Sequence, residues 1–223
     1  TADNNVAVGR AAMVLNTTGT DNVAMGAYAL DANTTGDDNT AIGDNALGAN
    51  TTANANTAVG SGVMFVNTSG TQNVGMGAFA LYANTTGTDN TAIGYNAMAA
   101  NTEGNSNIAI GKDALDSNTD ADYNIAIGTD ALQANTTGSS NVAIGRSVMD
   151  ANTTGGHNVA IGREALNDNT TGARNTAVGT FTMDGSTTGN DNVAVGYDAL
   201  GAGSQTGSNN VVVGNYALDA NTT

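Results

Sequence analysis

A repeat of 17 residues constrains this chain more than any other feature of its sequence. Residues 22–38 read NVAMGAYALDANTTGDD, and related segments recur from one end of the chain to the other. Of the twelve intervals between the first asparagines of successive copies, eleven are 17 residues long and the last is 18. A fixed period this short is typical of a solenoid, in which each repeat forms one coil stacked on its neighbours. The first asparagines of the copies, which define position 1 of a repeat numbered 1 to 17, are Asn5, Asn22, Asn39, Asn56, Asn73, Asn90, Asn107, Asn124, Asn141, Asn158, Asn175, Asn192 and Asn210.

The placement of the large apolar residues indicates a folded array. Leu, Ile, Val and Phe supply only 37 of 223 residues and the net charge is −15, a combination typical of disordered chains. These residues nevertheless recur at positions 2, 4 and 9, so stacking would gather them into one continuous core. We therefore expect an all-β fold, a parallel β-solenoid or β-roll of 13 coils, with residues 1–223 forming a single array. At a strand spacing of about 4.8 Å, such a rod would be roughly 60 Å long.

Alternation within the repeat predicts which side chains form the core. Positions 1 to 5 read as a short strand, and the Gly at position 5 would end it at a corner that requires positive φ. Position 4 is Val, Ile or Met and position 9 is Leu or Met in every copy, so both are expected to point inward. The predicted core residues are Val8, Met25, Ile42, Val59, Ile93, Ile110, Ile127, Ile144 and Ile161 at position 4, with Leu30, Leu47, Leu81, Leu115, Leu132, Leu166 and Leu200 at position 9.

The same alternation places alanine on the outside. Ala occupies position 3 in eleven copies and position 8 in ten, which predicts a stripe of small apolar side chains along the rod. An apolar stripe of this length would mark an assembly interface. The alternative is that Ala merely fits a tight corner of the coil. The candidate assembly face consists of Ala24, Ala41, Ala92, Ala109, Ala126, Ala143 and Ala160.

Positions 12 to 15 read N-T-T-G and predict a turn. Asn and Thr can hydrogen-bond to local backbone groups, and stacking places the Asn of one coil above that of the next, which allows amide ladders. The one-residue insertion lies within residues 201–207, where we expect a bulge. The array begins and ends at position 14, at Thr1 and Thr223, so both ends are expected to be uncapped, as in a piece of a longer protein or in subunits that stack end to end.

The sequence offers little for catalysis or cofactor binding. The single histidine, His157, lies at the variable position 17, so no enzyme activity is expected. No catalytic, cofactor-binding or metal-binding residue is predicted. Asp residues at positions 10, 16 and 17 could collect Ca²⁺, but a solvated acidic surface accounts for them better. Twenty acidic and five basic residues disfavour nucleic acid as a partner, and no apolar run approaches the ~20 residues of a membrane span.

The N-[VTI]-A-[VI]-G motif followed by A-L resembles the head repeats of YadA-like trimeric autotransporter adhesins, and similar arrays occur in predicted tail fibres of bacterial viruses. This resemblance implies a left-handed parallel β-roll and a non-enzymatic structural role outside the cell, on a cell surface or on a virion. We expect a segment of an extracellular fibre or filament with an adhesive role. Its partner would be the chain itself, as a homotrimer or an end-to-end filament, with a cell-surface or glycan ligand as a further candidate.

An alternative function uses the Thr and Asn ladders as a binding surface. Position 13 is Thr in twelve copies, and regular Thr arrays on solenoids can order water. The alternative is therefore a surface-binding protein that binds ice or glycans through these ladders.

Overall fold

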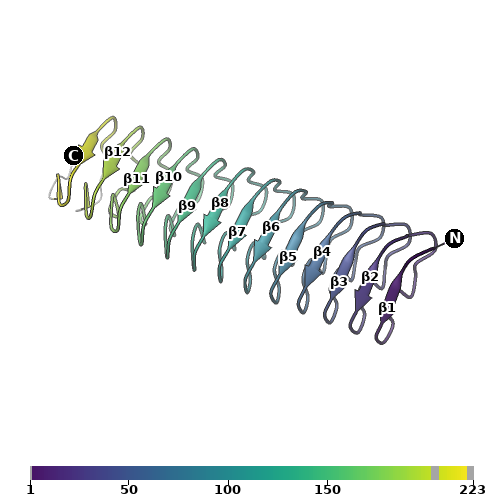
Figure 1. Cartoon of the computed structure of the whole chain (residues 1–223). Helices are drawn as coiled ribbons and strands as arrows, with labels where there is room; N and C mark the ends of the chain where they lie inside the picture. The colour runs from purple at the N-terminus through teal and green to yellow at the C-terminus, as the bar shows by residue number, and fades with distance from the viewer. Residues whose placement is uncertain (1, 202–205, 220–223) are drawn as a thin grey trace.

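The computed structural model describes residues 2–201 and 206–219 as an elongated all-β solenoid (Figure 1). Within these residues, 13 short strands form one parallel sheet in which every strand pairs with the strands of the adjacent coils in sequence order. The strands are Val6–Val8 (β1), Val23–Met25 (β2), Thr40–Ile42 (β3), Thr57–Val59 (β4), Val74–Met76 (β5), Thr91–Ile93 (β6), Ile108–Ile110 (β7), Ile125–Ile127 (β8), Val142–Ile144 (β9), Val159–Ile161 (β10), Thr176–Val178 (β11), Val193–Val195 (β12) and Val211–Val213 (β13). The predicted fold class is therefore confirmed. The bulge expected near the insertion falls largely outside the described residues.

The pairing register keeps the repeat in phase along the rod. Ala109 pairs with Ala92 on one side and Ala126 on the other, so each position of the repeat lies above the same position of the next coil. Even across the longer last interval, Val193 pairs with Val211. The strands follow one another along the rod (Figure 1). In-phase stacking therefore turns every position of the repeat into a ladder of similar side chains that runs the length of the solenoid.

The core is smaller than the sequence predicts. The side chains of position 9 are buried in every coil but the last, where Leu218 is exposed, and all seven predicted leucines are buried, among them Leu30, Leu115 and Leu200. The position 4 prediction is wrong, because those side chains point outward: Met25 is 43 % exposed and Ile110 is 36 % exposed. The other position 4 residues predicted as core are also exposed or only half-buried: Val8, Ile42, Val59, Ile93, Ile127, Ile144 and Ile161.

Alanine fills the interior instead. The seven alanines of the candidate assembly face, Ala24, Ala41, Ala92, Ala109, Ala126, Ala143 and Ala160, are all 0 % exposed. The prediction of an outward Ala stripe is therefore wrong. A coil of 17 residues has a narrow interior, which holds one large side chain at position 9 and small ones at positions 3 and 8. The strand consequently turns its small residue inward and its two larger residues outward.

The segment opposite the strand is a series of turns rather than an extended chain, which is why alternation fails there. In the second coil, Tyr28 and Leu30 at positions 7 and 9 have φ of 56° and 53°, and both Ala29 and Leu30 are buried. The left-handed conformation costs a non-Gly residue roughly 1–2 kcal/mol. Here it is compensated by burial of Leu30 and by hydrogen bonds to both adjacent coils, from Leu30 N to Ala46 O at 2.9 Å and from Tyr28 N to Arg10 O at 2.8 Å.

The position 5 glycines end each strand at the predicted corner. Gly43 has a φ of 139°, and a Cβ added to it would lie 2.3 Å from the carbonyl oxygen of Gly60 in the next coil. The backbones of successive coils approach too closely there for any side chain. Glycine is thus required by conformation and by contact at this position.

Two ladders of buried asparagines hold the coils together. The ladder predicted at position 12 is present, with Asn33 Nδ2 donating to Asn16 Oδ1 at 2.9 Å. A second ladder, which the sequence analysis did not predict, runs along position 1. There Asn107 Nδ2 donates to the Ala121 carbonyl at 2.8 Å, while Asn107 Oδ1 accepts from the backbone N of Asn124 at 2.9 Å. Each position 1 Asn thus hydrogen-bonds to one buried backbone group of its own coil and one of the next coil.

Candidate functional site

The outer face of the β-sheet is a long uncharged surface that runs along the solenoid. It is formed by positions 2 and 4 of every strand, which we call the sheet face. Of these 26 side chains, 22 are Val, Ile or Met and the other four are threonines: Thr40, Thr57, Thr91 and Thr176. Side chains at position 4 are mostly 36–43 % exposed, as at Ile144 and Met25. A contiguous apolar surface of this kind marks an interaction site.

Strict alternation along the repeat predicts an apolar assembly face but assigns it to the wrong residues. The alanines chosen for it lie inside the coil, while the larger residues chosen as core form the exposed apolar surface. One signal in the sequence distinguishes the two arrangements. Position 3 is Ala in eleven copies and Gly in a twelfth, whereas positions 2 and 4 vary among Val, Ile, Met and Thr, and a narrow interior favours the small residue.

The Thr and Asn ladders are used within the fold. Ten position 13 threonines among the described residues donate their hydroxyl to the carbonyl of the next coil's threonine, as Thr34 Oγ1 does to Thr51 O at 3.0 Å. The asparagines of positions 1 and 12 are almost all buried. Neither ladder presents a row of free polar groups to a ligand.

No protein-family model, curated protein or solved structure matches this chain.

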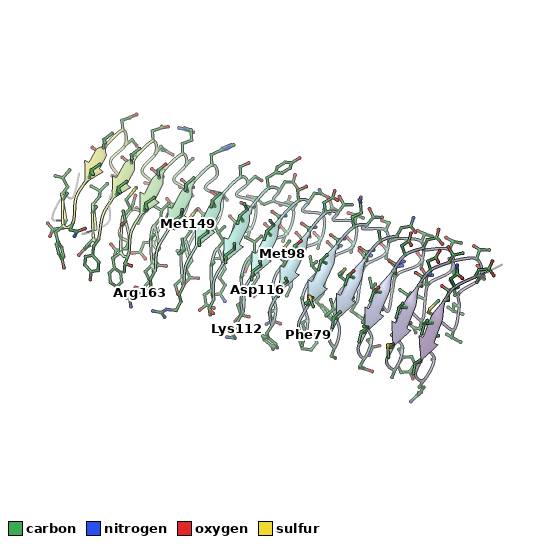
Figure 2. All side chains as sticks on the ribbon, viewed as in Figure 1. Phe79, Met98, Lys112, Asp116, Met149 and Arg163 are labelled. Atoms are coloured by element: carbon green, nitrogen blue, oxygen red, sulfur yellow. The ribbon has the colours of Figure 1, made fainter. Side chains whose placement is uncertain are left out.

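Four of the five basic side chains, those at position 6, lie along the turn edge that follows the strands, where Figure 2 labels Lys112 and Arg163. Lys112 Nζ is 2.8 Å from Asp113 Oδ2, and this hydrogen bond raises the pKa of Lys112. Arg146 instead reaches forward one coil to Glu164, at 2.9 Å. Arg163 lies over the Phe181 ring, with Cζ 4.4 Å from its centroid. The basic side chains of this edge are therefore held partly by ion pairs within and between coils and partly by cation–π contact.

A pair of acidic residues near the C-terminal end has an unusual environment. The pKa of Asp184 is raised to about 6, mainly by burial of its carboxyl group and to a smaller extent by the nearby charge of Asp198. Gly201 lies against this pair, since a Cβ added to it would be 1.8 Å from Asp198 Oδ1. In the described residues no group of three or more His, Cys, Asp or Glu side chains is arranged to hold a metal ion.

His157 lies on an exposed loop, where its backbone N donates to Ser139 O at 3.0 Å. His157 is at position 17, where residues of successive coils have a left-handed backbone conformation, and its φ is 60°. Across residues 2–201 and 206–219, no helix has the length and apolar character needed to cross a membrane.

Proposed function

We propose that this chain is a structural segment of an extracellular fibre with an adhesive role, and that copies associate with one another through the sheet face. The role is mechanical and not enzymatic. Each coil is joined to the next by parallel strand pairing, by two asparagine ladders and by a threonine ladder. Such one-dimensional stacking supports stiffness along the rod without any disulfide, since the chain contains no cysteine.

The charge distribution favours a second copy of the chain as the occupant of the sheet face. With a net charge of −15, two copies repel one another over most of their surfaces. Positions 2 and 4 carry no charged residue in any strand, so two copies can meet there without burying a charge. The exposed Ile and Val side chains would gain about 25 cal/mol for each Å² of apolar surface removed from water.

The size of the sheet face is sufficient for a specific contact. Thirteen strands at about 4.8 Å spacing, each about 10 Å wide, present roughly 600 Å². Two such faces in contact would bury about 1,200 Å², the lower end of the range for stable interfaces.

Sedimentation equilibrium of the purified chain tests this proposal. We expect the wild type to have a mass of two or more times 22.0 kDa, and three times that value if it forms a trimer. The double variant Ile110→Lys, Ile144→Lys should return to the monomer mass of 22.0 kDa. The matched control is Thr137→Lys, Thr154→Lys, which adds the same charge at the exposed position 14, where Glu103 and Asp120 already stand. A wild type of 22.0 kDa at all concentrations, or an equal effect of both variants, would refute the proposed face.

A further inference from the structure

Four aromatic side chains that are scattered in the sequence gather on the turn edge of coils four to six. The Phe65 and Tyr82 rings stack at 5.6 Å between centroids, and Phe79 meets Tyr82 edge-on at 5.9 Å. Phe79 also contacts Tyr95 in the next coil at 6.1 Å. Phe79 and Tyr82 remain 40 % and 38 % exposed, so the cluster is not a buried core. Figure 2 shows Phe79 projecting from the edge of the rod, at the turns that follow the strands.

A glycine opens a pocket beside these rings. Position 7 carries a side chain in every copy except the fourth, where Gly62 stands. A Cβ added to Gly62 would lie 3.1 Å from the Phe79 ring, so a longer side chain there would occupy the space in front of it. The resulting pocket has a volume of about 240 Å³, and its lining includes Phe65, Phe79 and Tyr82.

Three of the other residues that line the pocket are polar. Asp44, Asn45 and Ser61 line it, and Asn45 Nδ2 donates to Asp44 Oδ2 at 2.8 Å. This arrangement leaves a second carboxylate oxygen, the amide oxygen and a hydroxyl for a ligand. Among the residues that line the pocket, none is basic.

We propose that this pocket binds one ring of a neutral saccharide. A pyranose presents an apolar face of C–H groups, which suits the aromatic wall, and a rim of hydroxyls, which suits Asp44, Asn45 and Ser61. A carboxylate acceptor forms the stronger kind of hydrogen bond with such hydroxyls. Because no basic residue lines the pocket, the Asp44 carboxylate would repel an acidic sugar. The volume lies below the ~300–1,000 Å³ typical of pockets for drug-sized ligands, which fits a single ring of a longer glycan.

The saccharide site and the sheet face are independent surfaces. The pocket is lined by positions 6, 7 and 10 of the turn segment, whereas the sheet face comprises positions 2 and 4 of the strands. Association of copies therefore leaves the pocket open and places several identical pockets on one particle. Simultaneous binding by linked sites raises the avidity for a glycan-covered surface by ~10²–10⁴-fold. The binding chemistry itself does not depend on the proposed fibre role.

A glycan array of immobilised neutral and acidic oligosaccharides tests the site directly. We expect saturable binding of the wild type to a subset of neutral glycans, and inhibition by the matching free sugar. The variant Gly62→Asn fills the pocket with the residue that Asn45 and Asn96 supply at position 7, and should weaken binding at least tenfold while the far-UV circular dichroism is unchanged. Asp44→Ala should weaken binding similarly, because the carboxylate acceptor is lost.

The control is Phe181→Ala. Phe181 has the same repeat position as Phe79 but lies six coils away from it, so its removal should leave binding unchanged. Absence of binding to every neutral glycan, binding confined to acidic glycans, or equal binding by wild type and Gly62→Asn would each overturn the proposal. Sedimentation of Gly62→Asn should match the wild type, so failure of the saccharide site is distinguishable from failure of the sheet face.

Discussion

Ala109 and Ile110 are neighbours in strand β7, yet the smaller side chain is 0 % exposed and the larger one is 36 % exposed. The strand turns its methyl group toward the interior because Leu115 and its equivalents already fill the coil. This relationship repeats along the sheet and leaves a row of large apolar residues facing outward. Both the stability of the solenoid and its proposed assembly depend on it.

Enlarging Ala109 should therefore destabilise the fold more than altering Ile110. We expect Ala109→Leu to lower the free energy of unfolding by about 1–3 kcal/mol or more, because the packed interior cannot accept three further carbon atoms. Ile110→Thr, which places on the same face the residue that Thr91 supplies in the preceding coil, should cost under about 1 kcal/mol. Urea denaturation followed by circular dichroism measures both. A larger effect at Ile110 would show that the inward and outward sides are reversed.

Replacement of glycine should be costly at position 5 and tolerated at position 15. Gly43→Ala introduces a Cβ 2.3 Å from the Gly60 carbonyl oxygen at a φ of 139°, so we expect a loss above about 2 kcal/mol. Gly36→Ala is the matched control for conformation: its Cβ would lie as close, 2.4 Å, to the Ala53 carbonyl oxygen, but Gly36 does not have a positive φ, and Ala53 and Ala121 stand buried at position 15 in other copies. Thermal unfolding of the two variants provides the comparison. Equal melting temperatures would contradict a conformational requirement for glycine at Gly43.

The position 1 asparagine ladder should be less replaceable than the position 12 ladder. Asn107→Ala removes the amide that donates to Ala121 O and leaves the backbone N of Asn124 without its acceptor, a loss of about 2–4 kcal/mol. Asn118→Ser should be milder, because Ser186 occupies position 12 in a later copy and is buried there. Amide hydrogen exchange should show faster exchange confined to the coils around Asn107. Uniform protection in both variants would mean that the ladder adds nothing to stability.

Lowering the pH should stabilise the C-terminal coils, because Asp184 then becomes protonated. Its pKa of about 6 in the folded protein exceeds the ordinary value of 3.8, so the folded state binds the proton more tightly than the unfolded state. Stability from this group is thus highest below about pH 4 and is lost as the pH rises through 6. Because Asp184 is only partly buried, solvent screening limits the effect to on the order of 1 kcal/mol.

The variant Asp184→Asn isolates this contribution from the general effect of the net charge. Melting temperatures measured at pH 5 and pH 7.5 should differ less in the variant than in the wild type, and the variant should be the more stable of the two at pH 7.5. Burial also raises the pKa of Asp116 and Asp150, so part of the pH dependence should persist in the variant. An unchanged pH dependence would argue against ionisation of Asp184 as its source.

The period of the repeat was enough to predict the coil number, the parallel stacking, the Leu and Met ladder, the corner glycines and the position 12 asparagine ladder. It was not enough to orient the strand, because alternation separates position 3 from positions 2 and 4 without saying which side is inside. That choice depends on the width of the coil. The coil is narrow because positions 7 and 9 adopt left-handed backbone conformations, as at Phe79 and Leu81, and such conformations are not suggested by those residue types.

The aromatic pocket was also beyond the sequence analysis. Phe65, Phe79 and Tyr82 occupy two different positions of the repeat, so they appear sporadic along the chain. They meet only because the turn segment brings positions 7 and 10 to one edge of the rod. The one local signal was Gly62, the single glycine at position 7.

Covering of the sheet face by another copy is the central claim, and thiol labelling measures it most directly because the chain has no native cysteine. The rate of labelling would be measured for Ile110→Cys, on the sheet face, and for Thr137→Cys, on the exposed turn, across a range of protein concentrations. We expect labelling of Ile110→Cys to slow at least tenfold as concentration rises while that of Thr137→Cys stays constant. Equal and concentration-independent rates at both positions would contradict the claim.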